Sequence, residues 1–337
     1  METKLLSNST ADLQKAAHLL KEGNVVGIPT ETVYGLAADA RNPEAVRQIF
    51  AAKGRPADNP LIVHIAKLEE LESVAVSVPE LALKLAEKFW PGPLTMILPK
   101  HPSIPTITSG GLDTVGVRMP SHLVARKLIE LSGVPIAAPS ANISGYPSPT
   151  TAQHVMRDMH GKIAAVVDGG DCCVGVESTV IALEGEDSVR ILRPGYVTKE
   201  MLETVVPHVT LDKAILHQLQ EGQIVRSPGM KYQHYSPHAH VTLIEGRWPE
   251  FAAWVQQHAE AGTYALVFDG EGADLSVPYL TYGTGDAEQA HQVFAKLREL
   301  DDIGAKRVFV RAPNPNGIGL AVYNRLIRAA GFEVIQV

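Results

Sequence analysis

Two short segments carry the side chains best suited to a phosphate-rich ligand. Lys53-Gly54-Arg55 ends an alanine-rich stretch and precedes Pro56, so a predicted helix delivers two cations to a loop. Ser140-Ala141-Asn142 follows the apolar run 134–139, which is typical of a short buried strand. The carboxyl ends of strands are where open α/β sheets bind ligands. Two cations and two small polar groups there suit a polyphosphate.

Several of these residues also have interpretations that involve no ligand. A Lys-x-Arg at a helix end, as at Lys53, most often only complements the helix dipole. His64, inside the apolar run 61–65, is typical of a half-buried histidine. Ser148 fits a helix N-cap, and Arg193 precedes a Pro-Gly turn. Spacing alone therefore leaves their roles open.

A series of sequence blocks resembles the YrdC/Sua5 family. In chain order these blocks are TETVYGL at 30–36, KGRP at 53–56, NPLIVHI at 59–65, FWPGPLT at 89–95, VGVRMP at 115–120, PSANISG at 139–145, VESTV at 176–180 and RPG at 193–195. The segment SPGMKY at 227–232 also resembles the linker of the long, two-domain form.

The resemblance implies an L-threonylcarbamoyladenylate synthase, a nucleotidyltransferase. Such enzymes form threonylcarbamoyl-AMP and pyrophosphate from L-threonine, bicarbonate and ATP, for the t6A modification of tRNA position 37. The attacking carbamate oxygen is already charged, so positioning and charge neutralisation matter more than a general base. The resemblance also implies Mg²⁺ bound mainly through the ATP phosphates, no dedicated metal ligands, and transfer of the product to the tRNA threonylcarbamoyl transferase machinery.

Site residues follow from the matched blocks. Lys53 and Arg55 are the expected catalytic cations. The expected nucleotide-binding residues are Lys53, Arg55, Asn59, Thr114, Ser140, Asn142, Ser148, Arg193 and Tyr232. The expected L-threonine-binding residues are Thr32, His64, Arg118, Ala138 and Ser178.

Arg118 can bind the substrate carboxylate with two hydrogen bonds, and Thr32 and Ser178 can pair its polar groups. At Ala138 the family can carry a hydroxyl residue, so only a backbone contact is transferred there.

Alternating helix and strand patterns predict an α/β fold. The resemblance implies a YrdC-like open twisted mixed sheet with helices. Residues 240–337 alternate again and predict a smaller, doubly wound Rossmann-like domain, in which Gly317-Ile318-Gly319 is interpreted as a turn. We expect a catalytic domain at 1–207, a linker at 208–239 that closes over the active site through Tyr232, and a C-terminal domain at 240–337.

The composition is that of an ordinary globular protein. With 337 residues and 45% hydrophobic content the chain can form two domains, and its apolar runs are too short to span a membrane. The start of the chain does not resemble a signal peptide, so a cytoplasmic location is expected. The adjacent Cys172 and Cys173 are interpreted as packing residues, and His234, His238 and His240 as packing and solvent contacts rather than metal ligands.

Two other functions compete with the synthase. Carbamoyl transfer, as in hydrogenase maturation proteins with a related domain, is disfavoured because their cysteine-rich zinc fingers are absent from this sequence. An RNA-binding module is disfavoured by the net charge of -7 and by the lack of aromatic platforms. Direct tRNA binding is therefore not expected as the main role.

Overall fold

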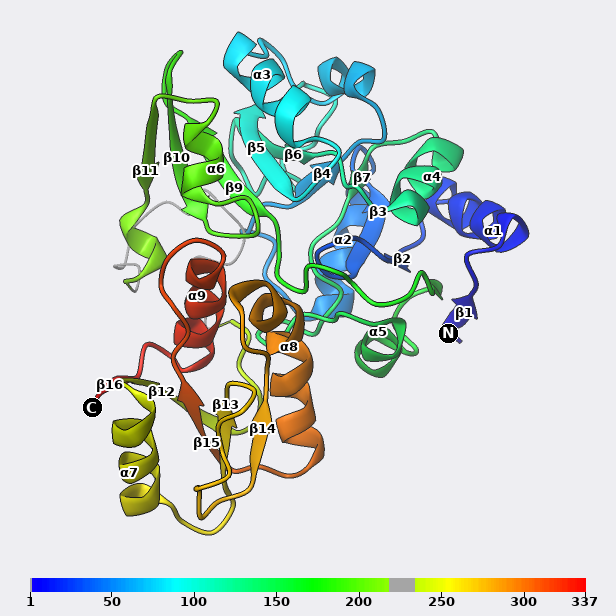
Figure 1. The fold of residues 1–337 in the computed structure, drawn as a ribbon. Coiled ribbons are helices and arrows are strands. Elements are labelled where there is room, and N and C mark those ends of the chain that lie inside the picture. The colour runs from blue at the N-terminus through cyan, green and yellow to red at the C-terminus, as the bar shows by residue number, and fades with distance from the viewer. Residues whose placement is uncertain (1, 218–233) are drawn as a thin grey trace. The chain divides into compact units, whose positions relative to one another are not determined.

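The computed structural model describes residues 2–217 and 234–337, which divide into two compact units (Figure 1). The first unit comprises 2–144 and 148–215, and the second comprises Gly145–Pro147, 216–217 and 234–337. Tyr232 and half of the expected linker, residues 218–233, lie outside the described residues. Closure of the linker over a site therefore stays a prediction.

The first unit contains a mixed sheet of eleven strands. Their order is β1-β8-β2-β3-β7-β4-β6-β5-β9-β10-β11, with parallel and antiparallel pairs interspersed. This is the predicted open mixed sheet. The strands are β1 (Lys4–Leu6), β2 (Val26–Ile28), β3 (Gly35–Asp39), β4 (Ile62–His64), β5 (Leu94–Pro99), β6 (Thr114–Arg118), β7 (Ile136–Ala137), β8 (Ala165–Val167), β9 (Thr179–Leu183), β10 (Ser188–Arg193) and β11 (His208–Leu211).

Helices cover this sheet according to the alternation of its side chains. Val26 and Ile28 belong to a buried cluster with residues of α1 and α4, whereas a Cβ on Gly27 would meet Val155 of α5, so these helices lie on opposite faces. The helical segments are α1 (Thr10–Lys21), α2 (Pro43–Lys53), the 3₁₀ helix η1 (Leu68–Ser73), α3 (Glu80–Phe89), α4 (Leu123–Ser132), α5 (Ala152–Met159), α6 (Lys199–Glu203) and the 3₁₀ helix η2 (Lys213–Ile215).

The sequence of α2 explains how two cations reach a loop. Asn42 caps its amino end by accepting from the N–H groups of Glu44 and Ala45, and Pro43 occupies its first turn. Gly54 ends the helix in the left-handed region at φ 62°, which glycine adopts without strain. Lys53 is therefore the last helical residue, and Arg55 starts the loop.

The middle of the sheet brings distant segments into register. His64 pairs with Arg118 across the parallel strands β4 and β6, and β7 is inserted between β3 and β4. The N–H of Ala138 donates to the Ile62 carbonyl at 3.0 Å, and Ser140 forms an isolated bridge with Gly35. The segments around residues 35, 64, 118 and 140 thus become neighbours.

The second unit is a parallel five-stranded sheet of order β14-β13-β15-β12-β16, as predicted for a doubly wound domain (Figure 1). Gly317, at φ 55°, turns the chain into the last helix, and a Cβ on Gly319 would lie 2.1 Å from the Asn314 carbonyl oxygen. The elements are β12 (His240–Glu245), α7 (Trp248–His258), β13 (Thr263–Val267), β14 (Tyr279–Thr281), α8 (Asp286–Asp302), β15 (Arg307–Arg311), α9 (Gly319–Ala329) and β16 (Val334–Gln336).

Some elements differ from the sequence-based expectation. The alternation of apolar residues within the expected linker also predicts a helix over 212–221, which is wrong over its described part, because residues 213–215 form a single 3₁₀ turn. Strands β1, β3, β11 and β14 were not predicted, because each is short or rich in small residues. β3, with the sequence GLAAD, has weak intrinsic strand preference and owes its conformation to burial between β2 and β7.

Candidate functional site

The expected threonine-binding residues meet around Arg118. This residue ends β6, and its Nη1 donates to Thr32 Oγ1 at 2.9 Å while its Nε donates to the Gly92 carbonyl at 3.3 Å. Thr32 lies in the loop between β2 and β3, and His64 ends the neighbouring strand β4. The structure therefore brings Thr32, His64 and Arg118 together from three separate parts of the chain.

Arg118 also forms a buried ion pair that the sequence analysis did not anticipate. Its Nη2 lies 2.7 Å from Glu31 Oε1, and the two side chains are only 4% and 5% exposed. Burial alone would raise the pKa of the Glu31 carboxyl, but the Arg118 guanidinium and nearby backbone N–H groups hold it below its ordinary value. Glu31 is therefore a carboxylate at neutral pH.

His64 is a neutral imidazole in this environment. Complete burial, followed by the charge of Arg118, lowers its pKa from 6.5 to about 3. Its Nδ1 is buried and has no hydrogen-bond partner among the described residues. A neutral ring with an unsatisfied nitrogen can accept from or donate to a substrate hydroxyl.

Ser178 is held by two neighbours at the start of β9. Its Oγ lies 2.8 Å from Thr95 Oγ1 and accepts from Arg193 Nη2 at 3.2 Å. Arg193 also donates to the Ser178 carbonyl through Nε and Nη2, at 3.1 and 3.0 Å. The structure thus joins an expected threonine residue to an expected nucleotide residue.

Lys53 secures the loop that contains Ser140 and Asn142. Its side chain is 3% exposed, and its Nζ donates to the Ser140 carbonyl and, at 2.7 Å, to the Asn142 carbonyl. The sequence analysis expected this ammonium to face phosphate. In the structure the ammonium binds Ser140 and Asn142 instead, the two polar residues that were also expected to bind the phosphates.

Asn59 is an unsatisfied polar group in the segment between α2 and β4. Its side chain is fully buried, and neither Oδ1 nor Nδ2 has a hydrogen-bond partner among the described residues. An amide left in this state costs about 1–3 kcal/mol, which a ligand can recover. Arg55, four residues earlier, is 9% exposed. These two residues suit a polar ligand that arrives from outside the chain.

Thr114 lies away from Arg118, at the opposite end of β6. Four residue steps along an extended strand separate the two Cα atoms by about 13 Å. Thr114 is therefore not part of the cluster around Arg118, although Arg193, another expected nucleotide residue, contacts Ser178. The distance between Thr114 and Arg118 suits two substrates side by side.

Ser148 does not cap a helix. Thr151 is the N-cap of α5, because its side chain accepts from the His154 N–H, whereas Ser148 Oγ donates to Glu177 Oε1 at 2.5 Å. Glu177 directly precedes Ser178 and is 6% exposed. The interpretation of Ser148 as an N-cap is therefore wrong, and a buried carboxylate lies beside it.

The sequence analysis missed Glu31 and Glu177 as site residues. Both lie inside blocks that it had already identified, TETVYGL and VESTV. The predicted site residues were mainly cations and hydroxyls, because these groups bind phosphate. Glu31 directly precedes Thr32, and Glu177 directly precedes Ser178. An acidic residue adjacent in sequence to an expected site residue was the signal that could have indicated them.

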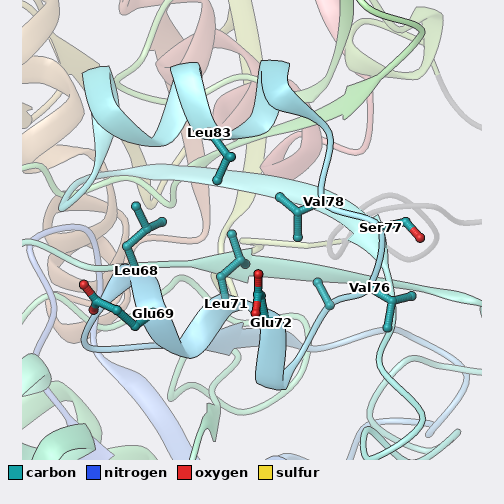
Figure 2. A pocket seen from close by; sticks show the side chains of 9 residues that line it. Leu68, Glu69, Leu71, Glu72, Val76, Ser77, Val78 and Leu83 are labelled. Carbon is teal, nitrogen blue, oxygen red and sulfur yellow. The ribbon is translucent and has the colours of Figure 1, made fainter.

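The pocket in Figure 2 lies elsewhere in the first unit, between η1 and α3. Its volume is about 710 Å³, and none of the expected site residues line it. The two charged side chains in its wall are Glu69 and Glu72, so it offers no cation to a phosphate. It is not the site that the sequence predicts.

The histidines and cysteines outside this site have ordinary surroundings. His238 lies 2.9 Å from Asp301, and His240 lies 3.1 Å from Glu333. Cys172 is buried, which raises the pKa of its thiol, and Cys173 is exposed. Within residues 2–217 and 234–337, no group of three metal-ligating side chains occurs and no helix could span a membrane.

Sequence comparison identifies both units. The family model Sua5_yciO_yrdC, described as "Telomere recombination", matches residues 18–195, and Sua5_C, described as "Threonylcarbamoyl-AMP synthase, C-terminal domain", matches residues 197–331. The threonylcarbamoyl-AMP synthase of Pyrococcus abyssi is 46% identical over 96% of this chain and 95% of its own length. The protein of the same name from Bacillus subtilis is 44% identical over 99% and 97%.

A solved structure is similar over the whole chain. The crystal structure of P. abyssi Sua5 complexed with L-threonine matches with a TM-score of 0.93 and 43% identity, and covers 100% of both chains. Both the fold and the order of the two domains are therefore shared with a protein known to bind this amino acid.

Proposed function

This chain belongs to the Sua5_yciO_yrdC family, and from that premise we propose that it is an L-threonylcarbamoyladenylate synthase. The observation that carries the proposal is the arrangement along β6. An arginine suited to a carboxylate ends the strand, and Thr114, one of the residues expected to bind the nucleotide, lies about 13 Å away at its start. A reaction that joins an amino acid to a nucleotide needs such a two-ended site.

Arg118 holds the α-carboxylate of threonine, and Thr32, His64 and Ser178 surround its amino and hydroxyl groups. The amino group and bicarbonate give a carbamate with release of water and a proton. A carbamate oxygen then attacks the α-phosphorus of ATP, and pyrophosphate leaves. Lys53 and Arg55 counter the charge on the phosphates, and this electrostatic contribution replaces a dedicated base.

The residues near Ser148 fit Mg²⁺, since the carboxylate of Glu177 and the hydroxyl of Ser148 are hard oxygen donors. In the proposed complex Glu177 and Ser148 would hold the ion from the protein side, and the ion would be bound mainly through the ATP phosphates. The ion would neutralise phosphate charge.

The product is a reactive mixed anhydride that a tRNA threonylcarbamoyl transferase must consume. The proposed enzyme therefore works in the cytoplasm, where ATP and tRNA are available, and direct tRNA binding is not its main role.

A pyrophosphate-release assay tests the function. The protein is incubated with ATP, Mg²⁺, L-threonine and bicarbonate, and each component is omitted in turn. Pyrophosphate that requires both threonine and bicarbonate, together with threonylcarbamoyl-AMP detected by mass spectrometry, is the expected result. Release that is independent of threonine, or tight RNA retention without turnover, contradicts the proposal.

A further inference from the structure

Glu31 is a buried acid with no role in the mechanism described above. It lies 2.7 Å from Arg118, the residue that the proposed function assigns to the substrate carboxylate. For binding an anion alone, a carboxylate in this position is a disadvantage, because it cancels the positive charge that attracts the substrate. Its presence makes physical sense if the substrate also carries a cation.

Arg118 retains donors for a substrate although it is already bound. A guanidinium has five N–H groups. Two are engaged in hydrogen bonds, with the Gly92 carbonyl and Thr32 Oγ1. Nη2 lies 2.7 Å from Glu31 Oε1 as an ion pair but has no hydrogen-bond partner among the described residues. N–H groups on both Nη atoms therefore remain, which is enough for both oxygens of a carboxylate. The ion pair therefore orients Arg118 without exhausting it.

The hydroxyl of Thr32 can still accept one hydrogen bond from a substrate. Thr30 Oγ1 donates its single proton to the Val33 carbonyl at 2.6 Å, so in its 2.8 Å contact with Thr32 Oγ1 it must accept. Thr32 thus donates to Thr30 and accepts from Arg118, which leaves one lone pair unused. That lone pair suits an ammonium or hydroxyl donor of the substrate.

The charges of the pocket sum to zero before a ligand binds. Arg118 contributes one positive charge, Glu31 one negative charge, and His64 is neutral. The α-ammonium of an amino acid is attached to the carbon next to its carboxylate, so a carboxylate bound by Arg118 brings the ammonium close to the neighbouring Glu31. Opposite charges interact strongly at such a buried position. A neutral pocket with adjacent opposite charges complements a zwitterion.

We infer that Glu31 selects the zwitterionic amino acid. It orients Arg118 for the carboxylate and opposes the α-ammonium of the same substrate. The inference rests on the proposed function, since it concerns the threonine that Arg118 would bind. It makes Glu31 a specificity-determining residue as well as a positioning residue.

Calorimetric binding tests this role with two ligands. One is L-threonine, and the other is 2,3-dihydroxybutanoate of the same stereochemistry, in which a hydroxyl replaces the ammonium. Wild-type protein should prefer threonine by about tenfold or more. Glu31→Gln should reduce this preference about tenfold, mainly by lowering the affinity for threonine. Glu31→Asp should retain part of the preference. Glu70→Gln, which alters a carboxylate bonded to the Ala66 N–H outside the site, should leave the preference unchanged.

The outcomes separate the two proposals. If wild-type protein binds both ligands equally, or if folded Glu31→Gln keeps the full preference, the role of Glu31 is wrong while the synthase function stands. The wild-type comparison decides this even if Glu31→Gln does not fold. If wild-type protein does not bind threonine at all, the proposed function itself is wrong.

Discussion

The two ends of the site differ in what holds their cations. At the amino-acid end, Arg118 donates to Thr32 and faces the opposite charge of Glu31, whose carboxylate oxygens have no hydrogen-bond partner among the described residues. At the nucleotide end, Lys53 binds backbone carbonyls where phosphate was expected, and the amide of Asn59 is buried without a partner in the described part of the chain. The difference indicates an arginine oriented by an opposite charge at one end and a lysine oriented by backbone carbonyls at the other.

Arg118→Met should give the largest effect. It removes the carboxylate donor and leaves Glu31 buried and unpaired, a change that typically costs about 3–5 kcal/mol. We expect kcat/KM for threonine to fall at least about a hundredfold, while the affinity for ATP changes less than about threefold. Steady-state pyrophosphate release with each substrate varied separately measures both.

Arg126→Met is the control, since Arg126 donates to the Ala66 carbonyl outside the site and is part-buried. An equal loss of ATP affinity in Arg118→Met would contradict the separation of the two ends.

Lys53→Met should affect the nucleotide end next most strongly. The ammonium holds the Ser140 and Asn142 carbonyls, so its loss releases the loop and removes a cation. We expect about a hundredfold lower turnover at saturating threonine and a lower melting temperature, because hydrogen bonds to charged groups contribute about 1.5–3 kcal/mol.

Lys162→Met, which loses a comparable bond to the Asp158 carbonyl, should lower the melting temperature without lowering turnover. If both variants retain full turnover, Lys53 has no role in catalysis.

Asn59→Ala should separate binding from stability. The amide has no hydrogen-bond partner within residues 2–217 and 234–337, so its removal should leave the free energy of unfolding unchanged or raise it by about 1 kcal/mol. ATP affinity should fall about tenfold. Denaturant unfolding and nucleotide titration measure the two quantities.

Asn42→Ala should behave in the opposite way. It removes the N-cap of α2, so about 1 kcal/mol of stability is lost while ATP affinity is retained. A destabilised Asn59→Ala with normal ATP binding would show that Asn59 is a structural residue.

His64→Gln should change the pH dependence of stability. Because the folded-state pKa lies near 3 and the ordinary value is 6.5, the unfolded chain binds a proton first as the pH falls. Stability contributed by neutral His64 is present above about pH 6.5 and is lost toward pH 3, with a slope of about 1.4 kcal/mol per pH unit. Unfolding titrations between these pH values should show a shallower slope in His64→Gln.

Identical slopes for wild type and His64→Gln would mean that His64 is not buried as a neutral ring.

Much of the fold and the location of the site follow from local sequence. The alternation of apolar residues predicts most helices and strands, and Gly54 predicts where α2 ends. The segment 208–215 was less predictable, because β11 pairs with β10 through backbone hydrogen bonds that leave little trace in side-chain pattern. The position of β7 between β3 and β4 could likewise not be predicted from the sequence, since the order of strands in a sheet is set by packing.

The sequence by itself determined which groups are available: the cations at the end of α2, the arginine that ends β6 and the hydroxyls around them. Only the tertiary structure decided their partners. Arg118 meets Glu31 and Thr32 from more than eighty residues away, and Lys53 meets Asn142 from 89 away. Charge and hydrogen-bonding capacity belong to the residue type, whereas burial and the resulting pKa depend on every element packed around it.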